Sequence, residues 1–567
     1  MQKSKNQLLG IGAIRIAKKC KRQFISKIFL TPKKNGLFRF ILNLKSLNKY
    51  IVNRHFKLED FKTVKNLIKK DCFMATMDLK DAYFLVSVHK RFRKYLRFKF
   101  QNKLYEFNCL PFGLSIAPRI FTKIMKPVVG FLRSKGLISN LYLDDFLLIG
   151  YTFTECEKNI VETRKILEKL GFIINYNKSS LIPATTCTYL GFYYDSKKFT
   201  VALPLEKCSR MLKLIASYKS KKSCKVRVFA MFLGSLISCC PVVPYGWVHT
   251  KMFERKKFKA LISSNGNFDS QMALSSKLYK DFIWWEKHIR DEMSLNPLCF
   301  KIEIFSDASS TGWGIFSNGE KSNGFWTLEE GRHHINYLEL LAALFGLRCF
   351  AKHLSNCSIL CRIDNITAIA CINRMGSIRY PRLNAISKKI WHWCETRNIF
   401  VFASYIKSLD NKEADRESRS SNYVNEFELN QGIFDRVVKA FGKPDIDLFA
   451  SRVNRKCDKF VSWHDDPDCF AVDAFTLDWS NFKFYAFPPF SLMLKVLQKI
   501  VNEKAEGIVV APYWVTQPWY PLFTSLLSKK PMFFEPRDDL LFYFDRSPHP
   551  LSGQLTLVVG HLSGKLY

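Results

Sequence analysis

Two adjacent carboxylates, Asp144 and Asp145, lie between two predominantly apolar runs, residues 136–143 and 146–150. Apolar runs of this length on both sides of a polar pair predict two buried strands joined by a hairpin turn. Carboxylates held together at a buried turn repel each other and lose hydration, and a divalent cation with oxygen ligands offsets both costs. A metal site is therefore one interpretation of the pair, and ordinary turn chemistry, which favours Asp, is the other.

Two upstream stretches bear on that choice. Residues 75–88 are predicted to form a strand with Asp78 near its end, followed by a turn with an aromatic residue. Residues 110–121 are predicted to form a Pro-Gly loop that opens into an amphipathic helix, and Gly113 would let the backbone approach a ligand closely. Taken singly, the first is also consistent with a strand-end cap and the second with a plain loop before a helix.

A third stretch is predicted to be a basic hairpin. Residues 25–30 and 37–44 alternate in polarity as strands do, and residues 31–36 supply a turn. This arrangement brings Lys34 and Arg39 near each other, where they would neutralise and orient a triphosphate. An exposed basic hairpin without a ligand is the alternative.

Composition narrows the class of partner. The chain of 567 residues has room for three or four domains, and its net charge of +39 with 15% aromatic residues favours a nucleic-acid partner over a basic soluble or membrane-surface protein. No apolar run reaches about 18 residues, so no membrane span is predicted. The 17 cysteines lack the paired spacing of a structural zinc site and no secretion signal is evident, which predicts reduced thiols in the cytoplasm or the nucleus.

Further acids occur in a second group of predicted elements. Residues 300–316 are predicted to form two strands, residues 336–347 a helix, residues 358–365 a strand and residues 411–415 the start of a helix. Each element carries one acid that, taken alone, is typical of a cap or a surface residue. These acids are Asp307, Glu339, Asp364 and Asp415.

Residues 25–44, 75–88 and 110–121, followed by the Tyr142-Leu143-Asp144-Asp145 motif, occur in an order that resembles the polymerase core of retroelement reverse transcriptases. Two later motifs of that family are also resembled, the first by Leu170-Gly171-Phe172 with Asn177 and Lys178 and the second by Tyr189 to Phe192. The resemblance implies that three acids bind two Mg²⁺ ions per active site, or Mn²⁺, and it assigns substrate contacts to further residues. The acids are Asp78, Asp144 and Asp145, and the substrate-binding residues are Lys34, Arg39, Tyr83, Phe112, Gly113, Tyr142 and Lys178.

The same resemblance implies an RNA template, a DNA primer, an RNA–DNA hybrid and deoxynucleoside triphosphates as partners. Tyr83 occupies the place of an aromatic steric gate that excludes a 2′-hydroxyl. One departure lies in the fingers, where Asn43 and Lys45 stand in place of an Asp and an Arg, so a structural ion pair is expected to be missing there.

The ordered set of Asp307, Glu339, Asp364 and Asp415 resembles the ribonuclease H fold and its four metal-binding carboxylates. This resemblance implies cleavage of the RNA strand of a hybrid with two Mg²⁺ ions and an activated water. Many members of that family carry a His in the loop before the last acid, but residues 405–410 contain none. His333 and His334 are the candidates to replace it, and slow cleavage is expected.

The tail alternates predicted strands, residues 444–451, 484–490 and 505–514, with a helix over residues 491–504, which predicts an α/β domain. It resembles the tail that follows ribonuclease H in the DIRS group of retrotransposons, which is similar to adenine DNA methyltransferases. Phe487 stands where those enzymes use an Asp or Asn, so a degenerate, non-catalytic domain is expected. A rearranged motif at residues 510–514 is the alternative.

Together these features predict an α+β and α/β multidomain chain. The predicted segments are 1–200, fingers and palm of a right-hand polymerase; 201–298, thumb and connection; 299–420, a mixed-sheet ribonuclease H-like domain; and 421–567, the C-terminal α/β domain. The serine-rich stretch 418–425 is the predicted last boundary. The start at Met1 so near the fingers suggests a truncated reading frame.

The predicted function is RNA-directed DNA polymerisation with ribonuclease H activity, copying retrotransposon RNA into DNA by two-metal nucleotidyl transfer. The alternative is a decayed or domesticated retroelement protein that binds nucleic acid without catalysis, and seven carboxylates in a basic chain argue against it. Methyl transfer as the main activity is disfavoured by Phe487. No aspartic-protease triplet or integrase zinc signature is found, so those functions are expected to come from elsewhere.

Overall fold

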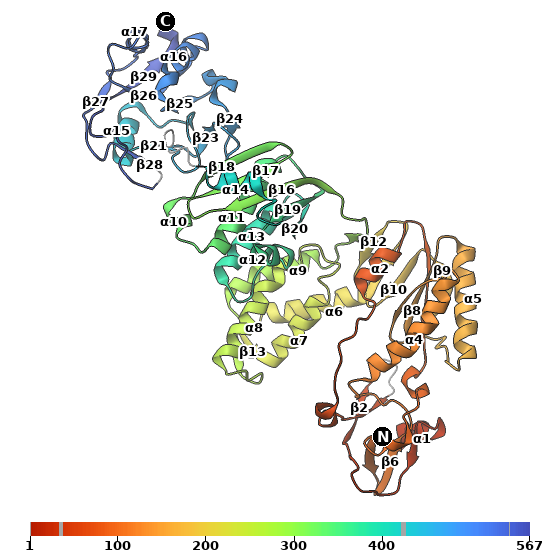
Figure 1. The fold of residues 1–567 in the computed structure, drawn as a ribbon. Coiled ribbons are helices and arrows are strands. Elements are labelled where there is room, and N and C mark those ends of the chain that lie inside the picture. The colour runs from red at the N-terminus through yellow and green to blue at the C-terminus, as the bar shows by residue number, and fades with distance from the viewer. Residues whose placement is uncertain (1, 33–37, 421–426, 544, 567) are drawn as a thin grey trace. The chain divides into compact units, whose positions relative to one another are not determined.

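The computed structural model describes residues 2–32, 38–420, 427–543 and 545–566 (Figure 1). The chain divides into two compact units. Unit 1 comprises residues 1–223, 234–246 and 274–297, and unit 2 comprises residues 224–233, 247–273 and 298–567. The interval 201–298, predicted as one thumb and connection segment, is thus divided between the two units. Residues 299–420 and 421–567 belong to one unit, and a bidentate ion pair between Arg452 and Glu330 links them.

A four-stranded antiparallel sheet in the order β7-β8-β4-β9 is the centre of unit 1. Two helices cover one of its faces, where alternate residues of β4 and β8, such as Met77 and Phe146, are buried with Phe121 and Ile160 of the helices. Residues on the other face point away from the helices because strand side chains alternate. The elements are β4 (Phe73–Asp78), β7 (Ile138–Tyr142), β8 (Asp145–Gly150), β9 (Ser180–Ala184), α4 (Ala117–Ser134) and α5 (Phe153–Lys169).

The predicted basic hairpin is confirmed as a pair of antiparallel strands, β2 (Ile28–Pro32) and β3 (Phe38–Leu42). A three-stranded sheet, β1-β6-β5, lies beside it in the same core. At the positions where an ion pair is expected to be missing, the Asn43 side chain accepts a hydrogen bond from the Lys45 amide at 3.3 Å. The sheet strands are β1 (Ile14–Ile16), β5 (Arg97–Phe100) and β6 (Lys103–Phe107).

The last part of unit 1 is a small sheet, β10-β11-β12-β15, with two helices. One of these helices, α6, covers residues 205–219. Trp285 is fully buried in the core, and the half-buried Trp284 stacks on His288 at 4.6 Å. The elements are β10 (Thr186–Tyr189), β11 (Phe192–Asp195), β12 (Thr200–Ala202), β15 (Met293–Ser294), α6 (Leu205–Lys219) and α9 (Tyr279–His288).

Unit 2 contains a five-stranded mixed sheet in the order β18-β17-β16-β19-β20, in which β16, β19 and β20 are parallel. Gly314 of β17 packs directly under one helix, and a Cβ there would overlap the carbonyl oxygen of Ala414. This close approach seats the helix on the sheet. The strands are β16 (Phe300–Ala308), β17 (Gly312–Ser317), β18 (Glu320–Phe325), β19 (Cys357–Ile363) and β20 (Ile399–Tyr405), and the helices are α11 (Ile335–Phe350), α12 (Ile366–Asn373), α13 (Pro381–Glu395) and α14 (Lys412–Ser418).

Helix α11 is buried on nearly all sides because it packs against the sheet and against α13. Its apolar character is therefore that of a core helix. Across the described part of the chain, no helix combines the length and the hydropathy needed to cross a bilayer.

The tail forms a seven-stranded sheet in the order β24-β23-β22-β25-β26-β29-β27, which confirms the predicted α/β organisation. Strands β22 to β26 run parallel, and β29 runs antiparallel to both β26 and β27. The chain order reverses beside β22, where a crevice is expected at the carboxyl ends of the strands. The elements are β22 (Ile446–Asp447), β23 (Lys459–Ser462), β24 (Ala471–Val472), β25 (Lys483–Ala486), β26 (Glu506–Pro512), β27 (Met532–Phe534), β29 (Leu557–Ser563) and α16 (Met493–Asn502).

Candidate active sites

Strand pairing brings the first acids together. Asp78 at the end of β4 lies directly opposite Asp145 at the start of β8, and paired residues point to the same face of a sheet. This face is the one turned away from α4 and α5. Asp144 lies in the two-residue turn between β7 and β8, where Leu143 has a φ of 57°, a left-handed conformation that is costly for a side chain of this kind. We refer to Asp78, Asp144 and Asp145 as the palm cluster.

The carboxyls of the palm cluster lie close enough to repel one another. Burial, the nearby charge of Asp144 and a hydrogen bond with Asp78 raise the pKa of Asp145 to about 7. The Asn175 side chain donates to Asp78 Oδ1 at 2.6 Å, and Lys178 Nζ lies 3.5 Å from Asp78 Oδ2. An acid that retains a proton near neutral pH beside two other carboxyls fits a site for divalent cations, whose charge would displace that proton.

The buried side chain of Tyr189 contacts both strands of the β7–β8 hairpin. The Tyr189 hydroxyl donates to the Asn140 side chain at 2.9 Å and to the backbone oxygen of Asp145 at 3.0 Å. Burial raises the Tyr189 pKa, so the hydroxyl keeps its proton. Tyr189 therefore positions the strand that carries Asp145. The sequence did not indicate a role for Asn175 or Asn140. Each lies on a different element from the acid it supports, so no regular spacing along the chain links the two.

Tyr83 forms the aromatic wall of the palm cluster. Its ring packs against Phe112 at 5.5 Å and Phe121 at 5.3 Å. Burial first, and the charge of Asp144 second, raise the pKa of Tyr83 to about 12. Tyr142 lies opposite Asp145 in the hairpin and is half-buried.

Gly113 holds the neighbouring loop in a conformation that other residues rarely adopt. Its φ is +106°, and a Cβ there would overlap the carbonyl oxygen of Leu42. Asn48 fastens this loop, because its side chain donates to the Gly113 oxygen at 2.9 Å and accepts from the Ser115 amide at 3.0 Å. Asn48 is a second positioning residue that the sequence did not reveal.

The two predicted triphosphate contacts differ in what the structure describes. Arg39 belongs to β3, opposite Thr31 of β2, which places its backbone on the predicted hairpin. Lys34 lies outside the described residues, as do its neighbours in the turn.

A second acidic cluster forms in unit 2. Asp307 of β16, Glu339 of α11 and Asp364, directly after β19, place one carboxylate oxygen each within 4.8 Å of one another. Burial, followed by the charges of Asp307 and Asp364, raises the pKa of Glu339 to about 9. Among the residues that the structure describes, none donates a hydrogen bond to the buried Oε2 atom of Glu339. An orphaned buried oxygen among carboxylates fits a cation-binding group, and we refer to these three residues as the nuclease cluster.

Asp415 lies beside the nuclease cluster on α14. The Arg419 guanidinium donates hydrogen bonds to Asp415 Oδ1, one of them from a terminal nitrogen at 2.8 Å. Asp415 is not one of the three acids whose oxygens converge. Its charge nevertheless contributes, after burial and Asp364, to raising the pKa of Asp307. The structure thus brings three of the four predicted acids together and leaves Asp415 paired at the rim.

Serine side chains hold two acids of the nuclease cluster. Ser418 Oγ donates to Asp307 Oδ2 at 2.6 Å, and Ser408 Oγ donates to Asp364 Oδ2 at 2.7 Å. Ser408 belongs to the loop in which a His was expected. His334 instead caps α11, since its Nδ1 accepts from the Asn336 amide at 3.1 Å, and His333 packs on Tyr337 at 4.1 Å.

A cavity of about 550 Å³ lies at the carboxyl ends of the tail strands, against β17 and β18. Phe487, directly after β25, lines it and packs against Phe427 at 5.2 Å and Phe490 at 6.3 Å. The loop that follows Asp447 engages both of its carboxylate oxygens, because Oδ1 accepts from the Phe449 amide and Oδ2 from the Lys456 amide. The residue at the predicted catalytic position is thus apolar and packed among aromatic rings.

Comparison with other proteins places a known family on the part of the chain that carries the palm cluster. Residues 31–194 match the family model described as "Reverse transcriptase (RNA-dependent DNA polymerase)". The Tf2-7 and Tf2-3 transposon polyproteins of Schizosaccharomyces pombe are each 26% identical to this chain over 231 residues, which is 41% of the chain and 16% of each polyprotein. The chain therefore spans about a sixth of the length of these relatives.

Solved structures with similarity to the chain include foamy viral protease-reverse transcriptases. One, in complex with an RNA/DNA hybrid, is 17% identical with a TM-score of 0.46 and aligns over 76% of this chain and 57% of its own. Another, in complex with dsDNA, is 18% identical with a TM-score of 0.46 over 72% and 82% of the two chains. In sequence, residues 31–194, which contain Asp78, Asp144 and Asp145, are similar to retroelement reverse transcriptases.

Proposed function

We propose that this protein is an RNA-directed DNA polymerase of a retrotransposon, which copies RNA into DNA and cuts the RNA strand of the resulting hybrid. The observation that carries the proposal is the pairing of Asp78 with Asp145 beside Asp144, inside the segment that matches the reverse transcriptase family. The net charge of +39 suits an RNA template, a DNA primer and their hybrid. Such a protein would act in the cytoplasm or the nucleus.

The palm cluster would hold two Mg²⁺ ions, with Asp78 and Asp145 contributing from adjacent strands and Asp144 from the turn. When bound, such ions activate the primer 3′-hydroxyl and neutralise the leaving pyrophosphate. Lys178 would release Asp78 to the metal and turn to the substrate, since its side chain is 65% exposed. Tyr83, held by Phe112 and Phe121, would exclude a 2′-hydroxyl, and Arg39 with Lys34 would steady the triphosphate.

The nuclease cluster would support the hybrid-cleaving activity. Glu339 would exchange its proton for a metal ion, and the orphaned Oε2 atom would become a ligand. Asp364 is oriented for the same task by Ser408, and Asp307 by Ser418. Asp415 would join after Arg419 turns away, which supports the expectation of slow cleavage.

The DIRS-like origin of the chain is also part of the proposal, and the tail supports it. Its strand order, with β29 antiparallel between β26 and β27, suits a relative of the DNA methyltransferases, and Phe487 suits one without catalysis. Purified protein with labelled S-adenosylmethionine and DNA should transfer no methyl group. Methylated adenine in that reaction would contradict a non-catalytic tail.

The decisive experiment is primer extension on an RNA template with Mg²⁺ and deoxynucleoside triphosphates, comparing the protein with its Asp144→Asn variant. Extension by the protein and none by the variant is expected. Binding of primer-template is measured for both in the same buffer.

A folded protein that binds primer-template without extending it would instead favour the decayed, nucleic-acid-binding alternative. A matched control is Asp71→Asn, an exposed acid on the loop before β4. This variant should extend the primer as the unmodified protein does.

A further inference from the structure

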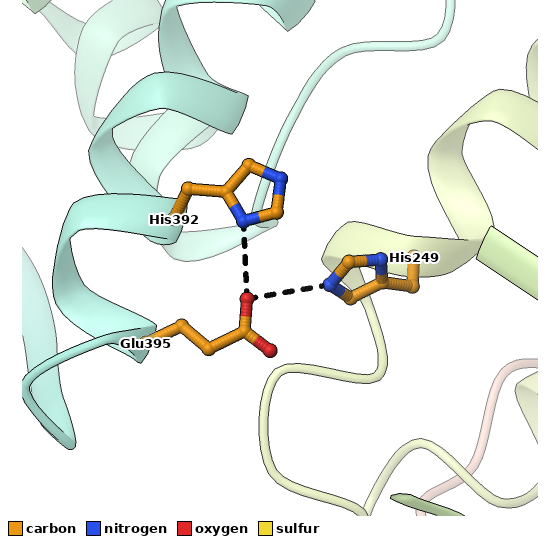
Figure 2. Close-up of side chains that lie close together, drawn as sticks. All are labelled: His249, His392 and Glu395. Carbon is orange, nitrogen blue, oxygen red and sulfur yellow. Dashed lines mark hydrogen bonds and ion pairs between the residues drawn. The ribbon is translucent and has the colours of Figure 1, made fainter. Parts of the chain in front are cut away.

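Two histidines and a glutamate converge in unit 2 away from both acidic clusters. His392 and Glu395 lie one turn apart on α13, and His249 approaches from a short 3-10 helix, residues 248–250, directly before α8 (Lys251–Ser263) (Figure 2). Both imidazoles direct a ring nitrogen at the same carboxylate oxygen. His392 Nδ1 lies 3.2 Å and His249 Nε2 lies 3.5 Å from Glu395 Oε2.

The spacing is that of ligands around one ion. In a tetrahedral zinc site with metal–ligand bonds of about 2.0–2.2 Å, two ligand atoms are about 3.4 Å apart. The two measured separations, 3.2 and 3.5 Å, bracket this value, and all three ligand atoms lie within 4.8 Å of one another. Two imidazoles and one carboxylate form a donor set that zinc uses in proteins, and imidazole nitrogen disfavours Mg²⁺.

We propose that His249, His392 and Glu395 bind a divalent transition metal of the zinc class, with a water completing the coordination. This inference is independent of the polymerase and nuclease activities. The neighbouring groups suit such a site. His249 is only 3% exposed, so an ion there would be shielded from solvent on one side, whereas the half-exposed His392 leaves a path for entry.

A metal bound by these three residues would link the segment that carries His249 to α13, which carries His392 and Glu395. The α8 segment already contacts the end of the α12–α13 connection, because Arg255 donates to the backbone oxygens of Ile378 at 2.7 Å and Arg379 at 3.1 Å. The three ligands come from both sides of this contact, residues 247–273 and α13. Binding to the folded chain would therefore stabilise the docking of α8.

The test uses the full chain, stripped of metal with a chelator and then dialysed against one to three equivalents of Zn²⁺ in excess Mg²⁺. The Mg²⁺ occupies sites made only of oxygen ligands, so that retained zinc reports a site with nitrogen or thiolate ligands. Loss of that zinc in the histidine variant below separates the proposed site from the free cysteines. Retained zinc is measured by mass spectrometry, and affinity by competition with a chromophoric chelator. The protein is expected to retain one equivalent, and His392→Ala is expected to bind it at least tenfold more weakly.

Two further variants keep the test decisive. Glu395→Gln retains a hydrogen-bond acceptor for the histidines but lacks the charge, and it should weaken zinc binding to a similar extent. His353→Ala removes an exposed histidine elsewhere in unit 2 and should bind zinc as the unmodified protein does. Zinc should raise the melting temperature of the protein and of His353→Ala but not of His392→Ala.

Zinc retention that is equal in all four proteins, or that disappears in excess Mg²⁺, would overturn the proposal. The three side chains would then form a hydrogen-bonded network in which Glu395 accepts from the two imidazoles.

Discussion

The palm cluster and the nuclease cluster both gather three carboxyl groups, but they keep them in different ways. The palm acids lie on neighbouring antiparallel strands and a hairpin turn, and Asn175 and Lys178 supply polar partners to Asp78. The nuclease acids come from two parallel strands and a helix, and Glu339 is buried with one oxygen unsatisfied. The comparison teaches that partners from a single nearby turn engage one acid of the palm cluster. In the nuclease cluster, serine hydroxyls hold two acids and leave the buried Glu339 to keep a proton.

The difference appears in proton affinity. The pKa of Asp145 is raised to about 7, and that of Glu339 to about 9, with burial as the largest cause in each case. At neutral pH the nuclease cluster therefore holds a proton that a metal ion would have to displace, and the palm cluster holds its proton less tightly. The variants and conditions below are designed to separate the two clusters.

The largest expected effect is the independent loss of each activity. Asp145→Asn should lower primer extension by about a thousandfold, and Asp307→Asn should lower hybrid cleavage by a similar factor, because several kcal/mol of charge stabilisation is lost. Each variant should retain the other activity. Both activities are measured on the same preparation, and a variant that loses both would show that the clusters depend on each other.

The second effect concerns the wall of the palm cluster. Tyr83→Val should reduce the preference for deoxynucleotides over ribonucleotides by about ten- to a hundredfold, because the ring no longer fills the space under the sugar. Single-nucleotide incorporation kinetics with each substrate measure the preference. Tyr83→Phe keeps the ring, and it should keep the preference. A Tyr83→Phe variant that incorporates ribonucleotides as readily as Tyr83→Val would contradict a steric gate.

The third effect is a difference in pH dependence. Between pH 7.5 and 8.5 the apparent Mg²⁺ affinity for hybrid cleavage should rise by about tenfold, because one proton on Glu339 must leave for each metal bound. The affinity for primer extension should change much less, because Asp145 is already mostly ionised above pH 7. Magnesium titrations at each pH test this, with Asp307→Asn correcting for background hydrolysis. Parallel profiles would contradict the difference between the clusters.

The smallest effect is on stability. A carboxyl whose pKa is raised by folding stabilises the fold fully below its unfolded pKa, near 4.5, and this stabilisation is lost as the pH rises towards 9. Glu339→Gln removes that loss, so with a chelator present it should raise the melting temperature by several degrees at pH 8. Little change is expected at pH 5. The same variant should cleave no hybrid. A lower melting temperature at pH 8 would contradict the conclusion that burial disfavours the ionised form of Glu339.

Much of the local structure could be predicted from the sequence. The hairpin of residues 138–150, the helix around Glu339 and the strand before Asp364 follow from apolar runs and their periods, which are properties of consecutive residues. The same local patterns placed six acids on these elements, and the resemblance to two families selected them as site residues: Asp78, Asp144, Asp145, Asp307, Glu339 and Asp364. Residues such as Asn48, Asn175 and Ser408 could not be found in this way, because each acts on a partner at least 44 positions distant.

The sequence by itself determined which elements form and which of them end in a carboxylate, since strand and helix periods and turn residues are local. Only the tertiary structure decided which carboxylates converge. It placed Asp415 at the rim with Arg419, and it brought His249 to His392 and Glu395 across 143 positions of chain, from 249 to 392. The reason is physical: a side chain's protonation and ligand set depend on burial and on neighbours in space, and packing between distant segments supplies both.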